Sequence, residues 1–402
     1  HSHTAVFGQT SSGKSSTVMV GSCISLARGK SSVVINDVFG ELYDITSGMF
    51  LREGYEVYKY NFRDPEHSEC FNSLPYCQSD SDLNMQSTLI HENSQTLSKG
   101  EVFWRQTSIM LLFLILKYLY HHVDRKYLTL QNALRIADRL AYDIPALDLL
   151  FVRTRDKELI SQYRAAVAMS EKTLQSVVIS LRTVLSLWND KAICSTTATN
   201  TFDITQLRSK PICIYLTTPI SDLNYTRPAT ALFFSTLFNQ ILSTPVQPSD
   251  RSIFFLLDEF PTYSFPDICT VFSTIRKRNA GLVICMQDER ALSARYGADT
   301  AHQIKTNCVS QVYLKGQPLS TCRELSAILG RFSLEGKTRE LLTPDEIRQL
   351  DEAIILIRNS PPMKAKMIPY FENYWMQRLL KAPPAPIPNR KPVIPALISF
   401  EK

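Results

Sequence analysis

Two kinds of hydrophobic pattern alternate along the chain and divide it into segments. Continuous apolar runs at residues 4–7, 32–37 and 55–60 are typical of strands buried on both faces, and segments with helical spacing follow the first two, at residues 16–28 and 41–53. Parallel strands need long crossover connections, which are usually helices, so this alternation predicts a parallel sheet covered by helices. Residues 1–82 are therefore predicted to begin an α/β domain.

From about residue 83 the helical period dominates, and strand signals are absent until about residue 195. The clearest helical pattern in this segment is an apolar stripe with three- and four-residue steps, formed by Leu174, Val177, Val178, Leu181, Val184, Leu185 and Trp188. The longest apolar run, at residues 109–120, is too short to span a bilayer and is typical of a buried helix. We therefore expect residues 83–195 to form an all-α domain inserted into the α/β fold.

The α/β pattern returns in the second half of the chain. Strands are expected at residues 211–216, 252–257, 281–285, 308–314 and 352–357, with a helix at residues 227–242. Residues 196–380 are thus predicted to complete the α/β domain. Residues 381–402 form a Pro-rich tail, and proline opposes both helices and central strands, so we expect this tail to be extended and mobile. A docking segment for a partner is the less favoured alternative.

A phosphate-binding loop lies between the first predicted strand and helix. The sequence Gly-Gln-Thr-Ser-Ser-Gly-Lys-Ser at residues 8–15 matches the pattern G-x-x-x-x-G-K-[ST], in which backbone N–H groups and a helix dipole face an anion. Lys14 would reach the β- and γ-phosphates of a nucleoside triphosphate, and Ser15 would bind Mg²⁺. The residues predicted to hold the nucleotide are Gly8, Gln9, Thr10, Ser11, Ser12, Gly13, Lys14, Ser15 and Ser16.

Hydrolysis needs an acid for the metal ion and a group that activates water, and two acids follow the apolar run at residues 253–257. The carboxyl ends of parallel strands form the edge at which open α/β sheets bind ligands. Asp258 is therefore predicted to bind Mg²⁺, and Glu259 to polarise the attacking water. The alternative is an exposed acidic turn, which the phosphate-binding loop upstream makes less favourable.

Two more residues are candidates, each with an open alternative. Gln287 follows the strand at residues 281–285 and is a candidate sensor of the γ-phosphate, although a solvated Gln at a strand end is as consistent with the pattern. Arg276 belongs to a run of three basic residues and is a candidate to reach the phosphate of a neighbouring subunit in a ring. A basic cluster on a solvated helix face, or near a path for DNA, fits the run equally well.

The composition bears on the kind of partner and on the cellular compartment. The net charge of +6 is compatible with an anionic partner but far from that of a dedicated nucleic-acid arm. Nine cysteines lack any C-x-x-C pair, and seven histidines lack metal-binding spacing, which favours reduced thiols in a cytosolic compartment over disulfides or zinc. The chain opens on His1 rather than Met, almost at its first strand, so we expect that an upstream segment has been removed.

The order of these motifs resembles that of the type IV secretion coupling ATPases, the TraG/TraD class of conjugative transfer. The family's D-P-K-G-E-L-Y-D element is similar to residues 37–44, where Val38 and Phe39 replace its Pro and Lys. The family's Walker B motif matches residues 256–260. Its glutamine motif with the trailing Y-G is similar to residues 284–297. Further similar segments lie at residues 61–74, 201–207, 341–347 and 361–366.

The resemblance implies a RecA-like P-loop NTPase core with a mostly parallel sheet and an inserted all-α domain, and ATP and Mg²⁺ as cofactors. It implies a homo-hexamer on the cytoplasmic face of the bacterial inner membrane, held by an N-terminal anchor outside this sequence. It also implies partners: relaxase-linked DNA–protein substrates or protein effectors, and components of the type IV secretion channel.

Three functions are therefore considered. The leading one is an ATP-hydrolysing coupling motor, with Lys14, Glu259, Gln287 and Arg276 as catalytic residues. A soluble ring-shaped DNA translocase of the chromosome-partitioning type would share the core but not the all-α insertion. A nucleotide-gated docking platform with little turnover would have no need of the base Glu259.

Overall fold

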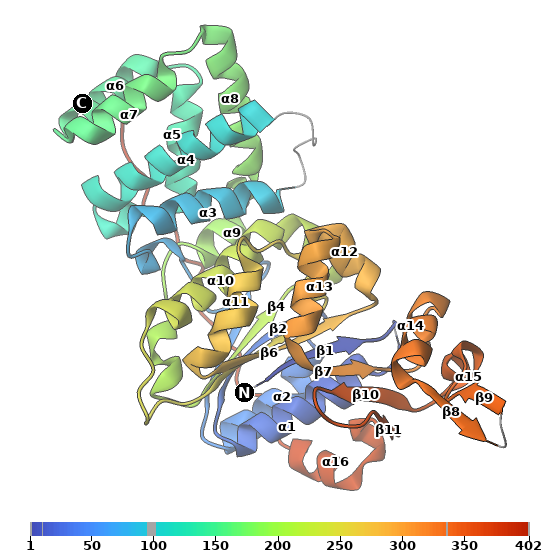
Figure 1. Ribbon diagram of the computed structural model, residues 1–402. Coiled ribbons are helices and arrows are strands. Elements are labelled where there is room, and N and C mark those ends of the chain that lie inside the picture. Colours follow the sequence, from blue (N-terminus) through green and yellow to red (C-terminus); the bar gives the residue numbers. More distant parts are fainter. Residues whose placement is uncertain (1, 10, 95–101, 335–336, 401–402) are drawn as a thin grey trace.

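A mixed sheet of nine strands forms the centre of the computed structural model, which describes residues 2–9, 11–94, 102–334 and 337–400 (Figure 1). Its strand order is β11-β10-β7-β1-β6-β5-β2-β4-β3. All strands from β7 to β3 in this order run parallel, whereas β10 and β11 are antiparallel to their neighbours. The strands are β1 (His3–Phe7), β2 (Ser32–Asp37), β3 (Glu56–Asn61), β4 (Ile212–Thr217), β5 (Ile253–Leu257), β6 (Ala280–Met286), β7 (Cys308–Tyr313), β10 (Ala353–Ile357) and β11 (Met363–Ala365).

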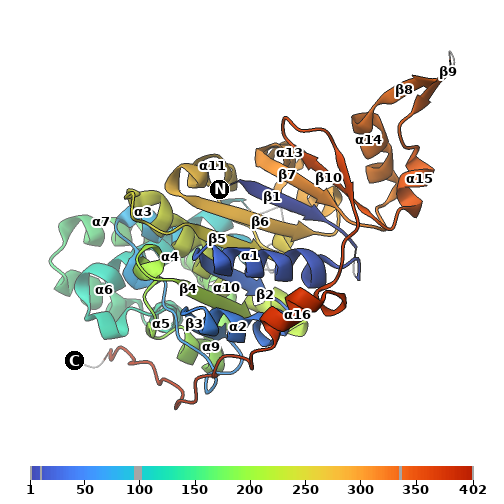
Figure 2. The same cartoon turned by 90° about the horizontal axis from the view of Figure 1, so that it is seen from below.

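Helices cover both faces of this sheet (Figures 1 and 2). One face carries the π-helical turn η1 (Lys14–Met19) and the helices α1 (Val20–Arg28), α2 (Glu41–Arg52) and α16 (Tyr374–Leu380). The other carries α10 (Leu223–Ser243), α11 (Ile268–Thr274), α12 (Glu289–Tyr296) and α13 (Ala298–Asn307). Successive side chains of a strand point to opposite faces, so Val33 and Ile35 pack with α1 and α2, whereas Val34 packs in the core that contains α10. The α/β core expected from the sequence is confirmed.

The predicted helical block lies between β3 and β4 and stacks beyond one end of the α/β layer (Figure 1). It consists of α3 (Asp80–Asn93), α4 (Val102–His122), α5 (Leu130–Leu140), α6 (Ile144–Arg153), α7 (Lys157–Val167), α8 (Glu171–Val184) and α9 (Lys191–Thr196). The apolar stripe of α8 is buried at Leu174, Val177, Val178, Leu181 and Val184. None of the helices in the described part of the chain has both the length and the apolarity needed to cross a bilayer.

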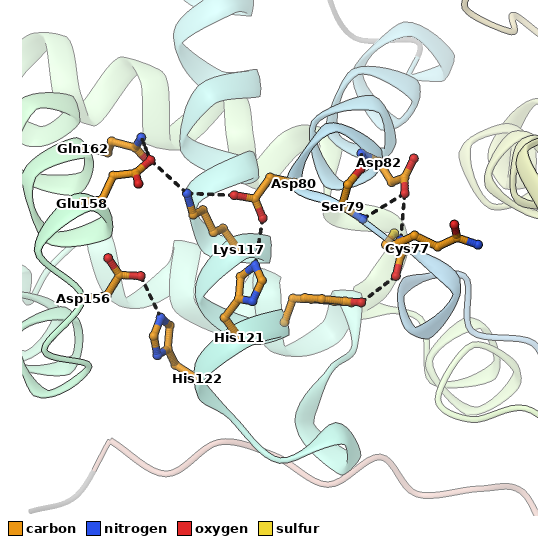
Figure 3. Close-up of polar contacts among 12 residues, drawn as sticks. Cys77, Ser79, Asp80, Asp82, Lys117, His121, His122, Asp156, Glu158 and Gln162 are labelled. Atoms are coloured by element: carbon orange, nitrogen blue, oxygen red, sulfur yellow. Dashed lines mark hydrogen bonds and ion pairs between the residues drawn. The ribbon is translucent and has the colours of Figure 1, made fainter. Parts of the chain in front are cut away.

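A buried ammonium group ties three helices of the all-α domain together (Figure 3). The Lys117 side chain, 9% exposed on α4, lies 2.9 Å from a carboxylate oxygen of Asp80 on α3 and 3.5 Å from one of Glu158 on α7. The hydrogen bond to Asp80 raises the pKa of Lys117. His121 also bonds to Asp80, at 2.8 Å, and His122 bonds to Asp156, the residue that caps the start of α7. The Lys117 ammonium therefore has two carboxylate partners within the domain.

The C-terminal part differs from the prediction in two ways. Two helices and a β-hairpin separate β7 from β10. They are α14 (Leu319–Leu329), β8 (Arg331–Leu334), β9 (Lys337–Glu340) and α15 (Pro344–Gln349). The Pro-rich tail is extended, as predicted, and it is docked against other elements, which the sequence did not indicate. Its backbone is hydrogen-bonded to α2 at Ala385 and to α5 at Ile398 (Figure 2). Proline excludes regular structure here, but it does not prevent docking of the remaining N–H and C=O groups.

Candidate functional site

The loop that joins β1 to η1 has the backbone of a phosphate cradle. Gly13 has a φ of 96°, a left-handed conformation that glycine adopts without a Cβ clash, and it opens the helix directly. A Cβ on Gly8 would lie 2.3 Å from the hydroxyl oxygen of Ser12, so the loop closes tightly at Gly8. Ser15 and Ser16 lie in the first turn of η1, where N–H groups lack helical partners. Thr10, also predicted to hold the nucleotide, lies outside the described residues.

Lys14 fills the centre of this loop. Its Nζ donates to the carbonyl of Gly8 at 2.6 Å and to that of Gln9 at 3.3 Å, and the residue is only 8% exposed. The hydroxyl of Ser12 is buried and has no hydrogen-bond partner among the described residues. An unpaired buried hydroxyl is costly, and a phosphate oxygen would satisfy it. The cradle therefore fits a polyphosphate.

The strand order brings the two acids to the same edge of the sheet, which we call the carboxyl edge because the parallel strands end there. β6 lies between β1 and β5, with Phe7 paired to Met286 and Leu257 paired to Ile284. Asp258 follows β5 directly and is 3% exposed. Burial raises the pKa of Asp258 to about 6; nearby Glu259 raises it further and Lys14 opposes the rise.

Glu259 is positioned by an unusual backbone. Its φ of 50° is in the left-handed region, which non-glycine residues rarely adopt, and its N–H donates to the Asp258 carboxylate at 3.1 Å. Unlike its buried neighbour, the residue is partly exposed. The strained turn thus directs one acid into the sheet edge and leaves the other accessible to water.

A second buried acid, Asp37 at the end of β2, joins this edge. Burial raises its pKa to about 6; the backbone N–H of Tyr43, which donates to it at 2.8 Å, lowers it, and the charge of Asp258 raises it. The preceding residue, Asn36, donates to the carbonyl of Asp258 at 2.8 Å, and its own Oδ1 is buried with no hydrogen-bond partner in the described part of the chain. Sequence reasoning missed Asn36, although a polar residue inside a continuous apolar strand was a signal for it.

A cavity of about 620 Å³ adjoins the phosphate cradle. Its first wall is the loop itself, at Ser11, Ser12, Gly13, Ser16 and Thr17. The opposite wall comes from chain segments far away in the sequence, at Leu314, Lys315, Asp351, Glu352, Lys366, Met367, Pro369, Phe371 and Glu372. The volume suits the base and sugar of a nucleotide whose phosphates lie in the cradle. Sequence reasoning did not assign these distant residues to the site, although Lys366 belongs to the family-like segment at residues 361–366.

The structure places the two remaining candidates at opposite edges of the sheet. Gln287 directly follows β6 and is exposed at the carboxyl edge, between the phosphate loop and the acids. Arg276 precedes β6, in the turn Ile275–Arg278 (η8). At about 3.3 Å per residue, the seven residues of β6 put Arg276 roughly 20 Å from the strand end that meets the phosphate loop. Within one subunit it is therefore not part of the phosphate site.

The available donors fit a magnesium ion bound together with a nucleotide. Within the described residues, no group of three or more His, Cys, Asp and Glu side chains forms a metal site by itself. Mg²⁺ is usually held by one or two carboxylates plus phosphate oxygens and water. Asp258 and the Ser15 hydroxyl are such ligands, so a cation here would need the phosphates to complete its shell.

Comparisons with known proteins agree with the family resemblance seen in the order of the sequence motifs. The sequence model of the family described as "Type IV secretory system Conjugative DNA transfer" matches residues 1–338 and 332–389. Protein VirD4 of Rhizobium radiobacter is 24% identical over 437 residues, covering 98% of this chain. The chain spans only about 60% of the length of that relative.

Solved structures share the fold. The plasmid coupling protein TrwB in complex with a non-hydrolysable ATP analogue has a TM-score of 0.73 and 19% identity, over 97% of this chain and 87% of TrwB. TrwB in complex with ADP and Mg²⁺ gives a TM-score of 0.73, 18% identity and the same coverage. At such identities the likeness concerns the fold, a mostly parallel α/β sheet with an inserted helical domain.

Proposed function

This chain belongs to the type IV secretory system conjugative DNA transfer family, and on that premise we propose that it is an ATP-hydrolysing coupling motor. The observation that carries the proposal is the pair Asp258–Glu259, delivered by β5 to the edge at which the phosphate loop opens, one strand away. The known binding of an ATP analogue, and of ADP with Mg²⁺, by the structurally similar TrwB supports ATP as the nucleotide.

Each residue has a distinct role in this proposal. Lys14, now held by loop carbonyls, would bind the β- and γ-phosphates, and the N–H groups at the start of η1 would surround them. Ser15 and Asp258 would hold Mg²⁺, which neutralises the charge that develops on the phosphate oxygens. Glu259, accessible to water, would orient and polarise the attacking water, with Gln287 beside the γ-phosphate.

Arg276 can take part only across a subunit boundary. Its distance from the phosphate loop of its own subunit excludes a role in cis, so we propose that it acts in trans in a homo-hexameric ring. Arg278, two positions on, has its carbonyl tied to Arg208, while the Arg276 side chain is exposed. We further propose that the ring lies at the cytoplasmic face of the bacterial inner membrane and passes relaxase-linked DNA or protein effectors to the type IV secretion channel.

Turnover by wild type and by Glu259→Gln tests the motor directly. The variant keeps the size and hydrogen bonding of the side chain but removes the base, so turnover should fall by about 10²–10⁴-fold while ATP affinity is retained. Glu53→Gln, in an exposed ion pair with Lys30 far from the loop, is the matched control. If wild type at ring-forming concentrations with DNA turns over no faster than Glu259→Gln, the chain is a docking platform and not a motor.

DNA as cargo is tested separately by binding. If several phosphates are contacted, the affinity for single- or double-stranded DNA should fall steeply with salt. A flat salt dependence, or no binding, would leave proteins as the only cargo.

A further inference from the structure

The turn that carries Glu259 needs support from outside its own segment. Its left-handed φ of 50° is costly for a residue with a Cβ, and such a conformation persists only where surrounding contacts fix it. After Glu259 the chain makes the short turn Phe260–Thr262 (η7), in which the N–H of Thr262 donates to the Glu259 carbonyl at 2.9 Å. That bond closes the turn but does not fix its orientation against the sheet. The contacts that do so come from other elements.

The first of these contacts comes from Asn36. Its side chain is fully buried in β2, and its Nδ2 donates to the carbonyl of Asp258 at 2.8 Å and to the hydroxyl of Tyr263 at 3.3 Å. One amide thus contacts the residue before Glu259 and the residue after η7. Both ends of the turn are therefore held against β2.

A second buried amide, that of Asn93, holds the next residue along the chain. Asn93 is the last residue of α3, which lies at the base of the all-α domain and packs against α10 (Figure 1). Its Nδ2 donates to the carbonyl of Ser264 at 2.8 Å, and its Oδ1 accepts from the N–H of Ser264 at 2.9 Å. One side chain therefore holds both backbone groups of Ser264, as a neighbouring strand would.

The Asn93 side chain is itself held firmly. It is fully buried, its Nδ2 also donates to the carbonyl of Leu89 at 3.0 Å, and its Oδ1 also accepts from Nη2 of Arg295 on α12 at 3.3 Å. An amide side chain offers two N–H groups and two acceptor positions, so its hydrogen-bonding capacity is fully used. The amide cannot rotate without losing a bond in a buried site, which is costly. The position of Ser264 is therefore tied to that of α3.

We propose that Asn93 is a positioning residue for ATP hydrolysis: by clamping Ser264 to α3, it keeps η7, and with it Glu259, in the orientation that serves the attacking water. The inference rests on the proposed function, because it assigns Glu259 the role of base. The all-α domain then contributes to the nucleotide site through a buried side chain. A displacement of α3 would alter turnover without any change in the phosphate loop.

The test is a double-mutant cycle, measured as single turnover of labelled ATP. Asn93→Ala should lower kcat by roughly 10- to 100-fold, because a misplaced base loses its alignment with the water, while ATP affinity changes by less than about twofold. In the background of Glu259→Gln the same substitution should cost less than about twofold, since the group that it positions has already lost its function. A purely structural role would lower turnover equally in both backgrounds.

Asn132→Ala is the matched control. Asn132 is fully buried in the same domain and likewise clamps a backbone, that of residues 396–398. Its loss should leave kcat unchanged. If thermal unfolding shows that Asn93→Ala does not fold, Asn93→Asp replaces it, because Asp keeps the acceptor for the Ser264 N–H but not the donor for its carbonyl. This variant should show a smaller loss of the same kind.

Hydrogen exchange, followed by mass spectrometry, tests the clamp without reference to turnover. Asn93→Ala should speed exchange of the amides at residues 262–265 by about threefold or more, and Asn132→Ala should leave them unchanged. If wild type turns over no faster than Glu259→Gln, the proposed function fails and exchange alone decides, with faster exchange supporting the clamp. Unchanged exchange in Asn93→Ala, or in an active enzyme an unchanged kcat or equal losses in both backgrounds, would overturn the inference.

Discussion

In the all-α domain the buried ammonium of Lys117 lies between two carboxylates, whereas at the carboxyl edge of the sheet two buried carboxylates, Asp258 and Asp37, lie near each other. In the first cluster the ammonium finds its carboxylate partners within the fold. In the second, burial raises the pKa of each acid to about 6, and at Asp258 the charge of Lys14 opposes this rise without cancelling it. Charge that is paired within the fold serves structure, and charge that is left unpaired marks where a ligand must complete the site.

The largest effect is expected from the substitution Lys14→Ala at the phosphate cradle. Lys14→Ala removes the cation of the phosphate cradle, so ATP affinity should fall by about 30- to 4,000-fold, which corresponds to the 2–5 kcal/mol typical of a lost partner for a buried charge. The melting temperature should change little, because the ammonium bonds only to two loop carbonyls. Titration with a fluorescent ATP analogue measures the affinity, and Lys30→Ala, in an exposed pair with Glu53, is the control. Retained affinity in Lys14→Ala would remove the cradle from the account.

Lys117→Met should lower stability and leave ATP affinity unchanged, the reverse of the result expected for Lys14→Ala. The side chain is 9% exposed, and its loss leaves Asp80 without its buried partner, so stability should fall by about 1–3 kcal/mol while ATP affinity stays unchanged. Because the partner carboxylates are 39% and 73% exposed, the loss should lie below that of a fully buried pair. Urea denaturation measures it.

Lys126→Met is the matched control for this change, since Lys126 is 59% exposed in its pair with Asp124 and should contribute little. Equal losses in the two variants would mean that the buried cluster does not stabilise the domain.

Acid should weaken magnesium binding at the carboxyl edge. Asp258 must be ionised to bind Mg²⁺, and its pKa is raised to about 6, so at pH 5 the ion has to displace a proton. The affinity for Mg²⁺ in the presence of ATP should therefore fall by roughly tenfold between pH 7.5 and pH 5. Isothermal titration at the two pH values measures it, and a pH-independent affinity would contradict a raised pKa.

The smallest effect is expected for Asp37, the buried acid at the end of β2. Because its pKa is raised in the folded state, Asp37 stabilises the fold at low pH, and this stabilisation is lost as pH rises from the unfolded value near 4 through about 6. Asp37→Asn removes the buried charge, so stability at pH 7.5 should rise by about 1 kcal/mol. At pH 5, where most of the folded protein carries a protonated Asp37, the difference between variant and wild type should largely disappear. A gain of the same size at both pH values would point to packing instead.

Much of the carboxyl edge could be predicted from the sequence because each part has a local signal. The phosphate loop is contiguous, and the two acids follow a buried strand directly. The position of Arg276 could also have been inferred, since a residue that precedes a parallel strand lies at the edge opposite to one that follows it.

Other features depend on contacts between distant segments and carry no local signal. Nothing around Asn132 indicates that its amide holds the backbone of residues 396–398. The far wall of the nucleotide cavity comes from residues 314–372, which only the order of β7 and β10 in the sheet brings to the phosphate loop. Composition alone suggested a mobile tail, because proline content reports what a segment cannot form and not what it can touch.

The most direct test of the central claim, that the unpaired acids await a nucleotide-bound cation, is the effect of Mg²⁺ on ATP binding in Asp258→Asn. In wild type at pH 7.5, Mg²⁺ should tighten ATP binding by at least about tenfold, since a carboxylate and the phosphates share the ion. In Asp258→Asn, which keeps the shape of the side chain but not its charge, that tightening should disappear. If Mg²⁺ tightens ATP binding equally in both proteins, Asp258 does not hold the metal ion, and the account of the carboxyl edge is wrong.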